Sequence, residues 1–175
     1  MTFTTPGGHR RFPREAIVSL IPKARERRPL LANLGASPDR LARAYKRARP
    51  ASQAASPAWL GRMTDAERSE FRERGRRLAA LLVRHLDAAD RSSGALVLEE
   101  ADAEAHAYGR TAAALGASLG EAVEGFLRFR SPFMNELAGL SRKRSLDTRE
   151  ATALLVDAEK AMDSLLISLM KGHSS

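Results

Sequence analysis

Three capping boxes mark helix starts in the last two thirds of the chain, and they constrain its fold more than any other feature. In each box a Ser, Thr or Asp side chain can accept a backbone N–H, and a Glu three residues later can reach back to the cap. The pairs are Thr64 and Glu67, Ser118 and Glu121, and Asp147 and Glu150. Apolar residues recur every three or four positions behind each box and again between them, as on one face of a helix. The pattern predicts four long helices, at about 64–89, 95–115, 118–140 and 147–172.

Short turns separate these four segments. Residues 91–94 are expected to form a turn, Gly116 to end the second helix, and residues 141–146 to form a loop. Pro132 is expected to kink the third helix or to end it at Ser131. Helices of this length joined by short turns favour an antiparallel up-and-down bundle, with a globin-like arrangement as the alternative. No strand pattern follows the first twelve residues.

The charge of the chain is concentrated at one end. Residues 1–62 hold 13 Lys and Arg against 3 Asp and Glu, whereas residues 63–175 hold 16 against 18. The net charge of +8 is therefore the sum of a strongly basic arm and a nearly neutral remainder. Such asymmetry favours a nucleic-acid-facing arm joined to a module of a different kind. The alternative is a solvated, arginine-rich linker.

The basic arm contains a predicted hairpin followed by two short helices. In residues 1–12, Thr and Phe flank a Pro-Gly-Gly sequence, and Gly supplies the positive φ that a tight turn requires. One short helix is expected at 13–21, between two prolines, and a basic helix at 38–49, capped by Ser37. Residues 50–57 have the composition of a linker.

The string TPGGHRRF, from Thr5 to Phe12, is the most specific in the chain. A hairpin tipped with glycines and followed at once by Arg10 and Arg11 presents basic side chains beside exposed backbone N–H groups. That combination suits the phosphate backbone of a nucleic acid. The alternative is a plain surface turn.

Together with the following PREAIVSL, this string closely resembles the wing and next helix of MerR-like and excisionase-like winged helix-turn-helix proteins. The resemblance implies that the two glycines form the wing turn and that the basic residues lie against DNA phosphates or the minor groove. The residues that it implies on the DNA side are Thr5, Gly7, Gly8, His9, Arg10 and Arg11. In that family a helix-turn-helix precedes the wing. Here Met1 falls just before the wing, so we expect a partial winged-helix unit that binds DNA weakly and without sequence selectivity.

The string GASLGEAVEGFLRFRSPF, with the helices around it, resembles the N-terminal helical domains of RsbR-type stressosome and sensor-kinase proteins. Those domains are globin-like or bundle-like signal-input modules, generally dimeric and often without haem. The resemblance implies a sensory or dimerising role without catalytic residues.

Few residues offer catalytic or metal chemistry. The chain has no Cys, which excludes disulfides, thiolate-bound zinc and a cysteine nucleophile. His85 and His106 fall on adjacent predicted helices, and Asp102 with His106 gives at best a two-ligand face. Ser131 has no His near it in sequence, and no glycine-rich phosphate loop follows a strand. We therefore expect no metal, no cofactor and no enzymatic activity.

Four aromatic residues of the predicted bundle are candidates for a ligand or dimer face. They are Tyr108, Phe126, Phe129 and Phe133. Because the phenylalanines are spaced three and four residues apart, we expect them to line the core or a dimer seam rather than a ligand pocket.

The expected protein is all-α, with a four-helix or globin-like antiparallel bundle preceded by a wing-like hairpin and a basic helical linker. Its domains are a partial winged-helix unit at 1–21, a basic linker at 22–62 and a sensor or dimerisation bundle at 63–175. Basic residues of the linker helix would add grip on DNA: Arg40, Arg43, Lys46 and Arg47.

The expected function is that of a homodimeric, DNA-binding transcriptional regulator. Charged residues interrupt every apolar stretch and the N-terminus lacks an apolar signal region, so no membrane segment and a cytoplasmic location are expected. The alternative is a stressosome-type signal-input or protein-interaction module that does not bind DNA.

Overall fold

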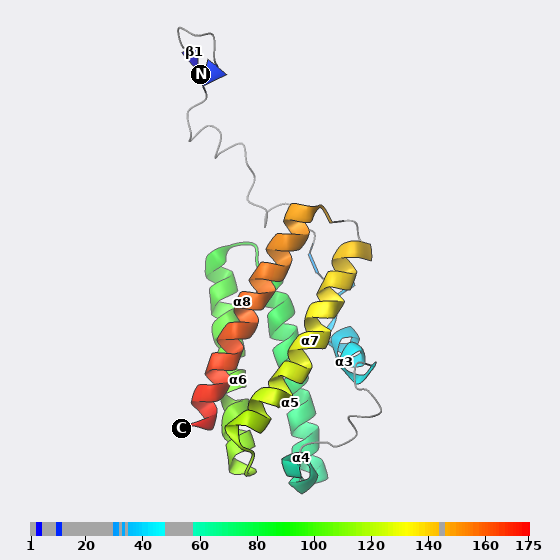
Figure 1. Ribbon diagram of the computed structural model, residues 1–175, viewed down its shortest axis with the longest axis vertical. Helices are drawn as coiled ribbons and strands as arrows, with labels where there is room; N and C mark the ends of the chain where they lie inside the picture. The colour runs from blue at the N-terminus through cyan, green and yellow to red at the C-terminus, as the bar shows by residue number, and fades with distance from the viewer. Residues whose placement is uncertain are drawn as a thin grey trace.

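The computed structural model describes residues 3–4, 10–11, 30–31, 33, 35–47, 58–143 and 146–175. Its short strands are β1 (Phe3–Thr4) and β2 (Arg10–Arg11). Its helices are α3 (Pro38–Arg47), α4 (Ala58–Arg62), α5 (Asp65–Asp87), α6 (Arg91–Ala114), α7 (Leu119–Lys143) and α8 (Thr148–His173) (Figure 1). The helical class expected from the sequence is confirmed. Helices α5 to α8 form the bundle, and each is about as long as its apolar pattern predicted.

The three predicted capping boxes are all present. Thr64 Oγ1 accepts from the Glu67 backbone N–H at 3.2 Å, and a Glu67 carboxylate oxygen accepts from the Thr64 N–H at 2.7 Å. The same reciprocal pair joins Ser118 to Glu121, and Asp147 caps α8 in the same way. Each box satisfies N–H groups that the first helical turn would otherwise leave without a partner.

Hydrogen bonds from cap backbone N–H groups lower the pKa of two glutamates. Glu67 accepts from Thr64 and Glu121 accepts from Ser118, and in each case the serine or threonine hydroxyl adds a second, smaller effect. Both interactions favour the ionised carboxylate. The caps at the start of α5 and α7 are therefore strongest where these carboxylates are charged.

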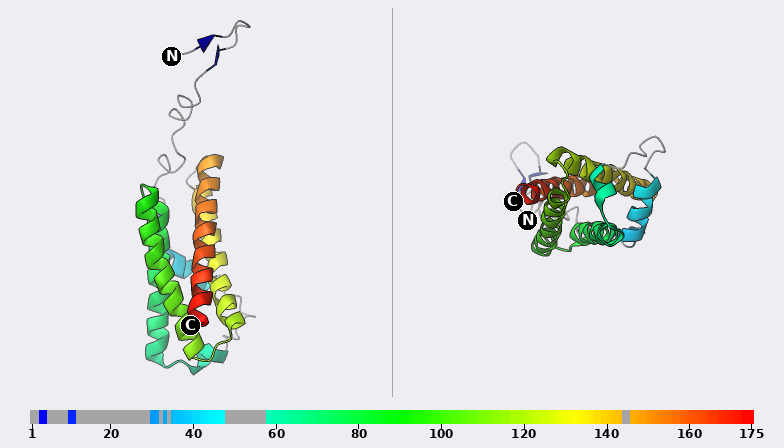
Figure 2. Two further views of the ribbon diagram at one scale, coloured as in Figure 1. Left: turned by 90° about the vertical axis from the view of Figure 1, so that its left-hand side faces the viewer. Right: turned by 90° about the horizontal axis from the view of Figure 1, so that it is seen from below.

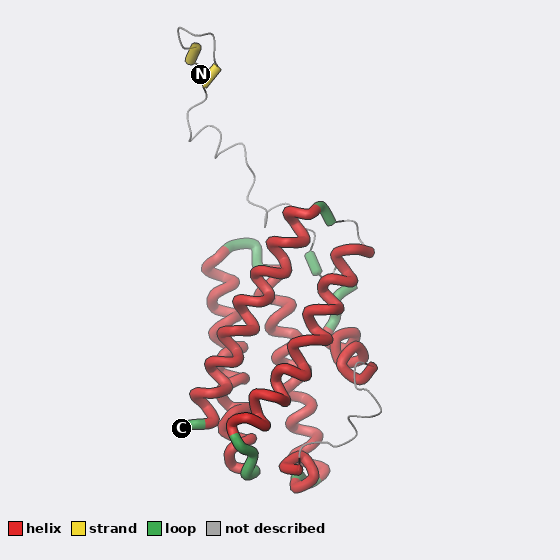
Figure 3. Tube along the Cα trace, viewed as in Figure 1, coloured by secondary structure: helices red, strands yellow, loops and turns green. Residues whose placement is uncertain are grey.

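The predicted turn at 91–94 was wrong, and of the two alternatives for Pro132, an end of the helix at Ser131 is excluded. The expected turn at 91–94 is the first turn of α6, because the Asp90 side chain caps the helix by accepting from Ser93 N–H at 2.8 Å. Pro132 does not end α7, which continues unbroken to Lys143, so residues 141–143 of the expected loop are helical (Figure 3). Burial explains its tolerance there: Pro132 and the next residue, Phe133, both pack into the core, which offsets the missing backbone hydrogen bond.

Helices α6 and α8 form the closest pair in the bundle and run parallel. Ser164 Oγ of α8 donates to Asp102 of α6 at 2.9 Å, and further along both helices Gly172 lies against the His106 backbone. A Cβ atom added to Gly172 would lie 2.0 Å from the His106 carbonyl oxygen. In a simple up-and-down bundle these two helices would sit on a diagonal. Here the absence of side chains at glycine positions lets them touch.

Because α6 and α8 touch each other, α5 and α7 lie apart on the opposite side of the bundle, and helix α3 occupies the space between them. It packs against α5 and α7, and the end-on view in Figure 2 shows it between them. Leu41 of α3 is buried, and so are Leu31 before it and Trp59 of α4. The region expected to be a linker at 22–62 therefore contributes core residues where it is described.

The core is aliphatic with a few large aromatic side chains. Its largest fully buried side chains are Leu31, Trp59, Leu82, Leu86, Phe133, Leu137, Leu140, Leu154, Met162, Leu165 and Leu169. None of the described helices is both long and apolar enough to cross a lipid bilayer.

Candidate nucleic-acid interface

The first candidate surface is the pair of short strands β1 and β2 near the N-terminus. Strand β1 pairs antiparallel with β2, so that Phe3 lies opposite Arg11 and Thr4 lies opposite Arg10. The five residues between the strands, Thr5 to His9, lie outside the described residues, as does the predicted helix at 13–21. The basic pair Arg10-Arg11 directly follows the segment predicted as the wing turn.

The second candidate surface is the basic helix α3. It begins at Pro38, and Ser37 Oγ accepts from the Arg40 backbone N–H at 3.1 Å, as its predicted cap requires. The Arg40 guanidinium donates through Nε to Glu136 of α7, whose side chain is only 16% exposed. An Arg47 nitrogen lies 3.9 Å from the other oxygen of Glu136.

Through these contacts Arg40 has a structural role in α3. Arg40 holds the helix against α7, whereas Arg43 is exposed and Arg47 keeps 66% of its side-chain surface. The side chain of Lys46 lies outside the described residues. Of the four residues expected to grip DNA from this helix, Arg43 and Arg47 are therefore the two shown to face solvent.

The candidate aromatic face lies mostly in the interior. Phe126 and Phe133 are 5% and 2% exposed, so a second chain cannot reach them as a dimer face. Phe129 is half-buried between them, with ring centroids 6.4 Å and 5.8 Å away. The ring of Tyr108 packs on that of Phe71, with the two centroids 4.3 Å apart. The spacing of the phenylalanines therefore reflects packing in the core, and core or dimer seam were the two interpretations that the sequence favoured.

The histidines also serve structure where their contacts are given. His85 is buried, and its Nδ1 donates to the Gly94 carbonyl oxygen at 2.7 Å, which ties α5 to the start of α6. His173 Nε2 lies 2.8 Å from the Ala117 carbonyl oxygen. Among the described residues, no three His, Asp or Glu side chains are placed together to hold a metal ion.

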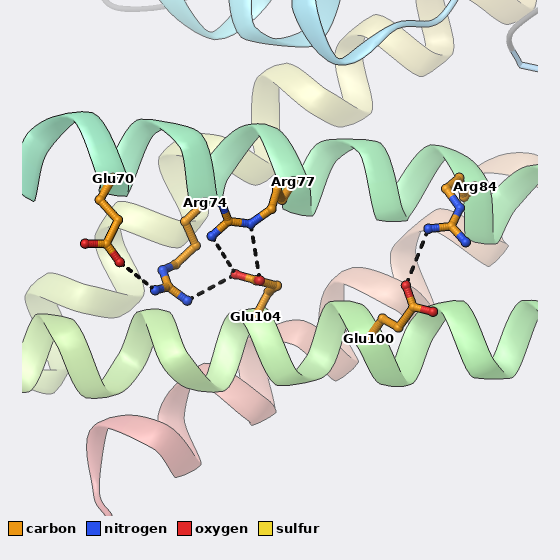
Figure 4. A network of polar contacts seen from close by, with 6 residues as sticks. All are labelled: Glu70, Arg74, Arg77, Arg84, Glu100 and Glu104. Atoms are coloured by element: carbon orange, nitrogen blue, oxygen red, sulfur yellow. Dashed lines mark hydrogen bonds and ion pairs between the residues drawn. The ribbon is translucent and has the colours of Figure 1, made fainter.

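The structure adds one polar feature that the sequence reasoning missed: ion pairs between α5 and α6 (Figure 4). Glu104 accepts from Arg74 at 3.1 Å and from Arg77 at 3.3 Å. Arg84 and Glu100 pair at 3.4 Å further along the same two helices. The signal was available in the sequence, because Arg77 and Arg84 are seven residues apart and Glu100 and Glu104 are four residues apart. Spacings of seven and four each place a pair on one helix face.

A shallow groove of about 560 Å³ lies between these ion pairs on the outer side of α5 and α6. It is lined by Arg77, Ala80, Leu81, Arg84, Glu100, Ala103, Glu104 and Ala107. Its apolar lining consists of one leucine and three alanines, and charged side chains stand at both ends.

No protein-family model, no curated protein and no solved structure matches this chain. The two resemblances drawn from its sequence therefore stay predictions, and its function is argued from the residues themselves.

Proposed function

We propose that this chain is a DNA-binding transcriptional regulator, or a part of one, in which the basic arm grips the DNA backbone and the helical domain dimerises and receives a signal. The observation that supports it most directly is the pairing of β1 with β2, which closes a hairpin around the TPGGH segment and carries Arg10 and Arg11 on its second strand. Basic residues after a glycine-tipped hairpin suit phosphate contacts, which position a protein on a duplex without reading its sequence.

The distribution of charge supports the same proposal. The +10 balance lies in residues 1–62, and the bundle is close to neutral, so attraction to a polyanion would act through the arm. Arg43 and Arg47 give α3 exposed basic side chains of its own. Arg40 contributes less, because its guanidinium is engaged by Glu136.

The ion pair between Arg40 and Glu136 also favours a second candidate function, a signal-input module that does not bind DNA. If the arginines of α3 serve mainly to dock this helix on α7, part of the positive charge has a structural cause. The two functions differ in one measurable property, which is affinity for duplex DNA.

A titration of the full chain against a mixed-sequence DNA duplex tests the proposal. Fluorescence anisotropy is measured at several salt concentrations. Each phosphate contact contributes a slope of about −0.9 to log K against log salt, so the double variant R10A/R11A should lose about two units of slope and bind more weakly at every salt concentration. A loss of slope of a third of this value or less would contradict direct contact of Arg10 and Arg11 with DNA phosphates.

The matched control is the double variant R72A/R149A, which removes the same charge from exposed positions of the bundle. It should leave the salt slope near that of the unmodified chain. Equal losses in both variants would reduce the effect to net charge, and absence of binding by the unmodified chain at low salt would favour the signal-input function instead.

A further inference from the structure

The groove on the outer side of α5 and α6 is bounded by two ion-pair rungs. Arg77 and Glu104 form one rung, and Arg84 and Glu100 form the other (Figure 4). Between them the surface is made of small side chains and Leu81. Alanines on a helix surface allow a second helix to approach closely, because no long side chain stands between the backbones.

Both rungs retain unused hydrogen-bonding capacity. Arg77 is 44% exposed, and Arg84 and Glu100 are 60% and 56% exposed, whereas Glu104 is 25% exposed and already accepts from both Arg74 and Arg77. A guanidinium has five N–H donors and a carboxylate about four acceptor sites. The Arg84–Glu100 rung therefore presents donors and acceptors to a molecule placed over the groove, and the Arg77–Glu104 rung presents mainly the donors of Arg77.

The charges of the two helices are complementary along this face. On this face α5 presents Arg77 and Arg84, whereas α6 presents Glu100 and Glu104. A partner that fits this face must present a negative row over α5 and a positive row over α6. The same face of a second copy does so.

We propose that the outer face of α5 and α6 is the dimer interface of this protein, with a second copy of the chain as its partner; the proposal rests on the dimeric regulator proposed above. A two-fold axis parallel to the helices places α5 of each copy over α6 of the other at equal height. Arg77 then meets Glu104 of the second copy, and Arg84 meets its Glu100. Each rung becomes an alternating ring of two arginines and two glutamates, as a self-complementary interface requires, and the less exposed Arg74 of each copy stays paired with its own Glu104 behind the first ring.

The size of the face agrees with this role. Helices of 23 and 24 residues are each about 35 Å long, and two side by side are about 20 Å wide, which gives roughly 700 Å² per copy. A standard specific interface buries about 800 Å² per partner. The exposed Leu96 of α6 adds apolar surface near one end.

The molar mass of the full chain in solution, measured by sedimentation equilibrium without DNA, tests the interface. The unmodified chain should have twice its 19.1 kDa mass, and the dimer should weaken as salt rises because the rungs are exposed. Ala103→Arg places a large cation in the exposed alanine floor and should raise the dimer Kd more than about 100-fold. Ile167→Arg is the matched control, an exposed apolar position on α8, and should leave the dimer intact.

A charge-swap pair gives the sharper result. The variants R77E/R84E and E100R/E104R should each be monomeric, because like charges would face each other across the two-fold axis. Mixed together, they should form a heterodimer, because every position then meets an opposite charge. Circular dichroism confirms that each variant is folded before mixing.

A monomeric unmodified chain, a dimer that survives Ala103→Arg, or loss of the dimer in Ile167→Arg alone would overturn the interface. Failure of the mixed variants to associate would do the same. The mass measurement contains no DNA and the anisotropy titration requires no dimer, so failure of either proposal is recognised separately.

Discussion

Replacing Gly109 of α6 with Ala tests the central packing contact of the fold. A Cβ atom at this position would lie 2.0 Å from the Leu169 carbonyl oxygen and 2.8 Å from the His173 backbone nitrogen, both in α8. Carbon and oxygen atoms normally approach to about 3.3 Å, so the two helices would have to separate by about 1 Å. The obstructing atoms belong to a helix backbone, which cannot swing aside as a flexible side chain does.

The expected magnitude is a balance of two effects. Overpacking of a tight contact costs about 1–3 kcal/mol and sometimes more. Ala is favoured over Gly inside a helix by about 1 kcal/mol. Separation of the helices also weakens neighbouring contacts along α6, where Ala105 and Ala112 are buried. We expect a net loss of about 2 kcal/mol in the free energy of unfolding, near the upper end of the overpacking range after the helical gain is subtracted.

Urea denaturation followed by circular dichroism measures this loss, and thermal unfolding should show a decrease in Tm of about 4–8 °C. Gly139→Ala in α7 and Gly75→Ala in α5 are the matched controls, because nothing lies within 4 Å of a Cβ added at either position. Both should stabilise the protein by up to about 1 kcal/mol. If Gly109→Ala is as stable as these controls, the close approach of α6 and α8 is refuted.

Three further perturbations follow from single contacts. Glu121→Gln should reduce the loss of stability on acidification. A carboxylate whose pKa is lowered by folding stabilises the protein above its unfolded pKa, and this contribution disappears as pH falls through the folded pKa. The free energy of urea unfolding should therefore differ less between pH 7 and pH 3 in the variant than in the unmodified chain. Ser164→Ala should cost about 1–2 kcal/mol in urea denaturation, because Asp102 loses a partly buried hydrogen bond. Glu136→Gln should cost about 0.5–1 kcal/mol and speed amide hydrogen exchange in α3, because Arg40 loses its charged partner; unchanged exchange would refute the docking role of this pair.

Local signals in the sequence predicted local structure well. The capping boxes fixed three helix starts, and Gly116, with φ of +74°, lies just past the end of α6 as a terminating glycine should. Each of these features depends on residues within four positions of one another. The missed cap of α6 is equally local, because Asp90 and Ser93 form it. The Ser-Ser-Gly sequence at 92–94 concealed this cap, because its composition is typical of a turn.

Contacts between distant segments were not predictable in the same way. Trp59 follows a stretch of linker composition, yet it is 1% exposed and packs edge-on against Phe71. No periodicity over five helical residues could indicate which surface α4 covers. The basic character of α3 suggested a partner outside the protein, whereas Arg40 has its partner on α7, 96 residues away. A charge pattern gives the sign of a partner and not its location.

Gly172 shows how one residue can carry both kinds of information. Its position at the end of an apolar stripe predicts a helix terminus, and α8 does end at His173. Its second role, contact with the His106 backbone, is visible only when α6 and α8 are side by side. This contact also bears on the proposed interface, because α6 then lies between α8 on one side and α5 on the other. In the proposed dimer, a second copy docked on the outer face of α5 and α6 would press on the helix that α8 holds most closely, so a shift of α8 would reach the proposed interface through α6.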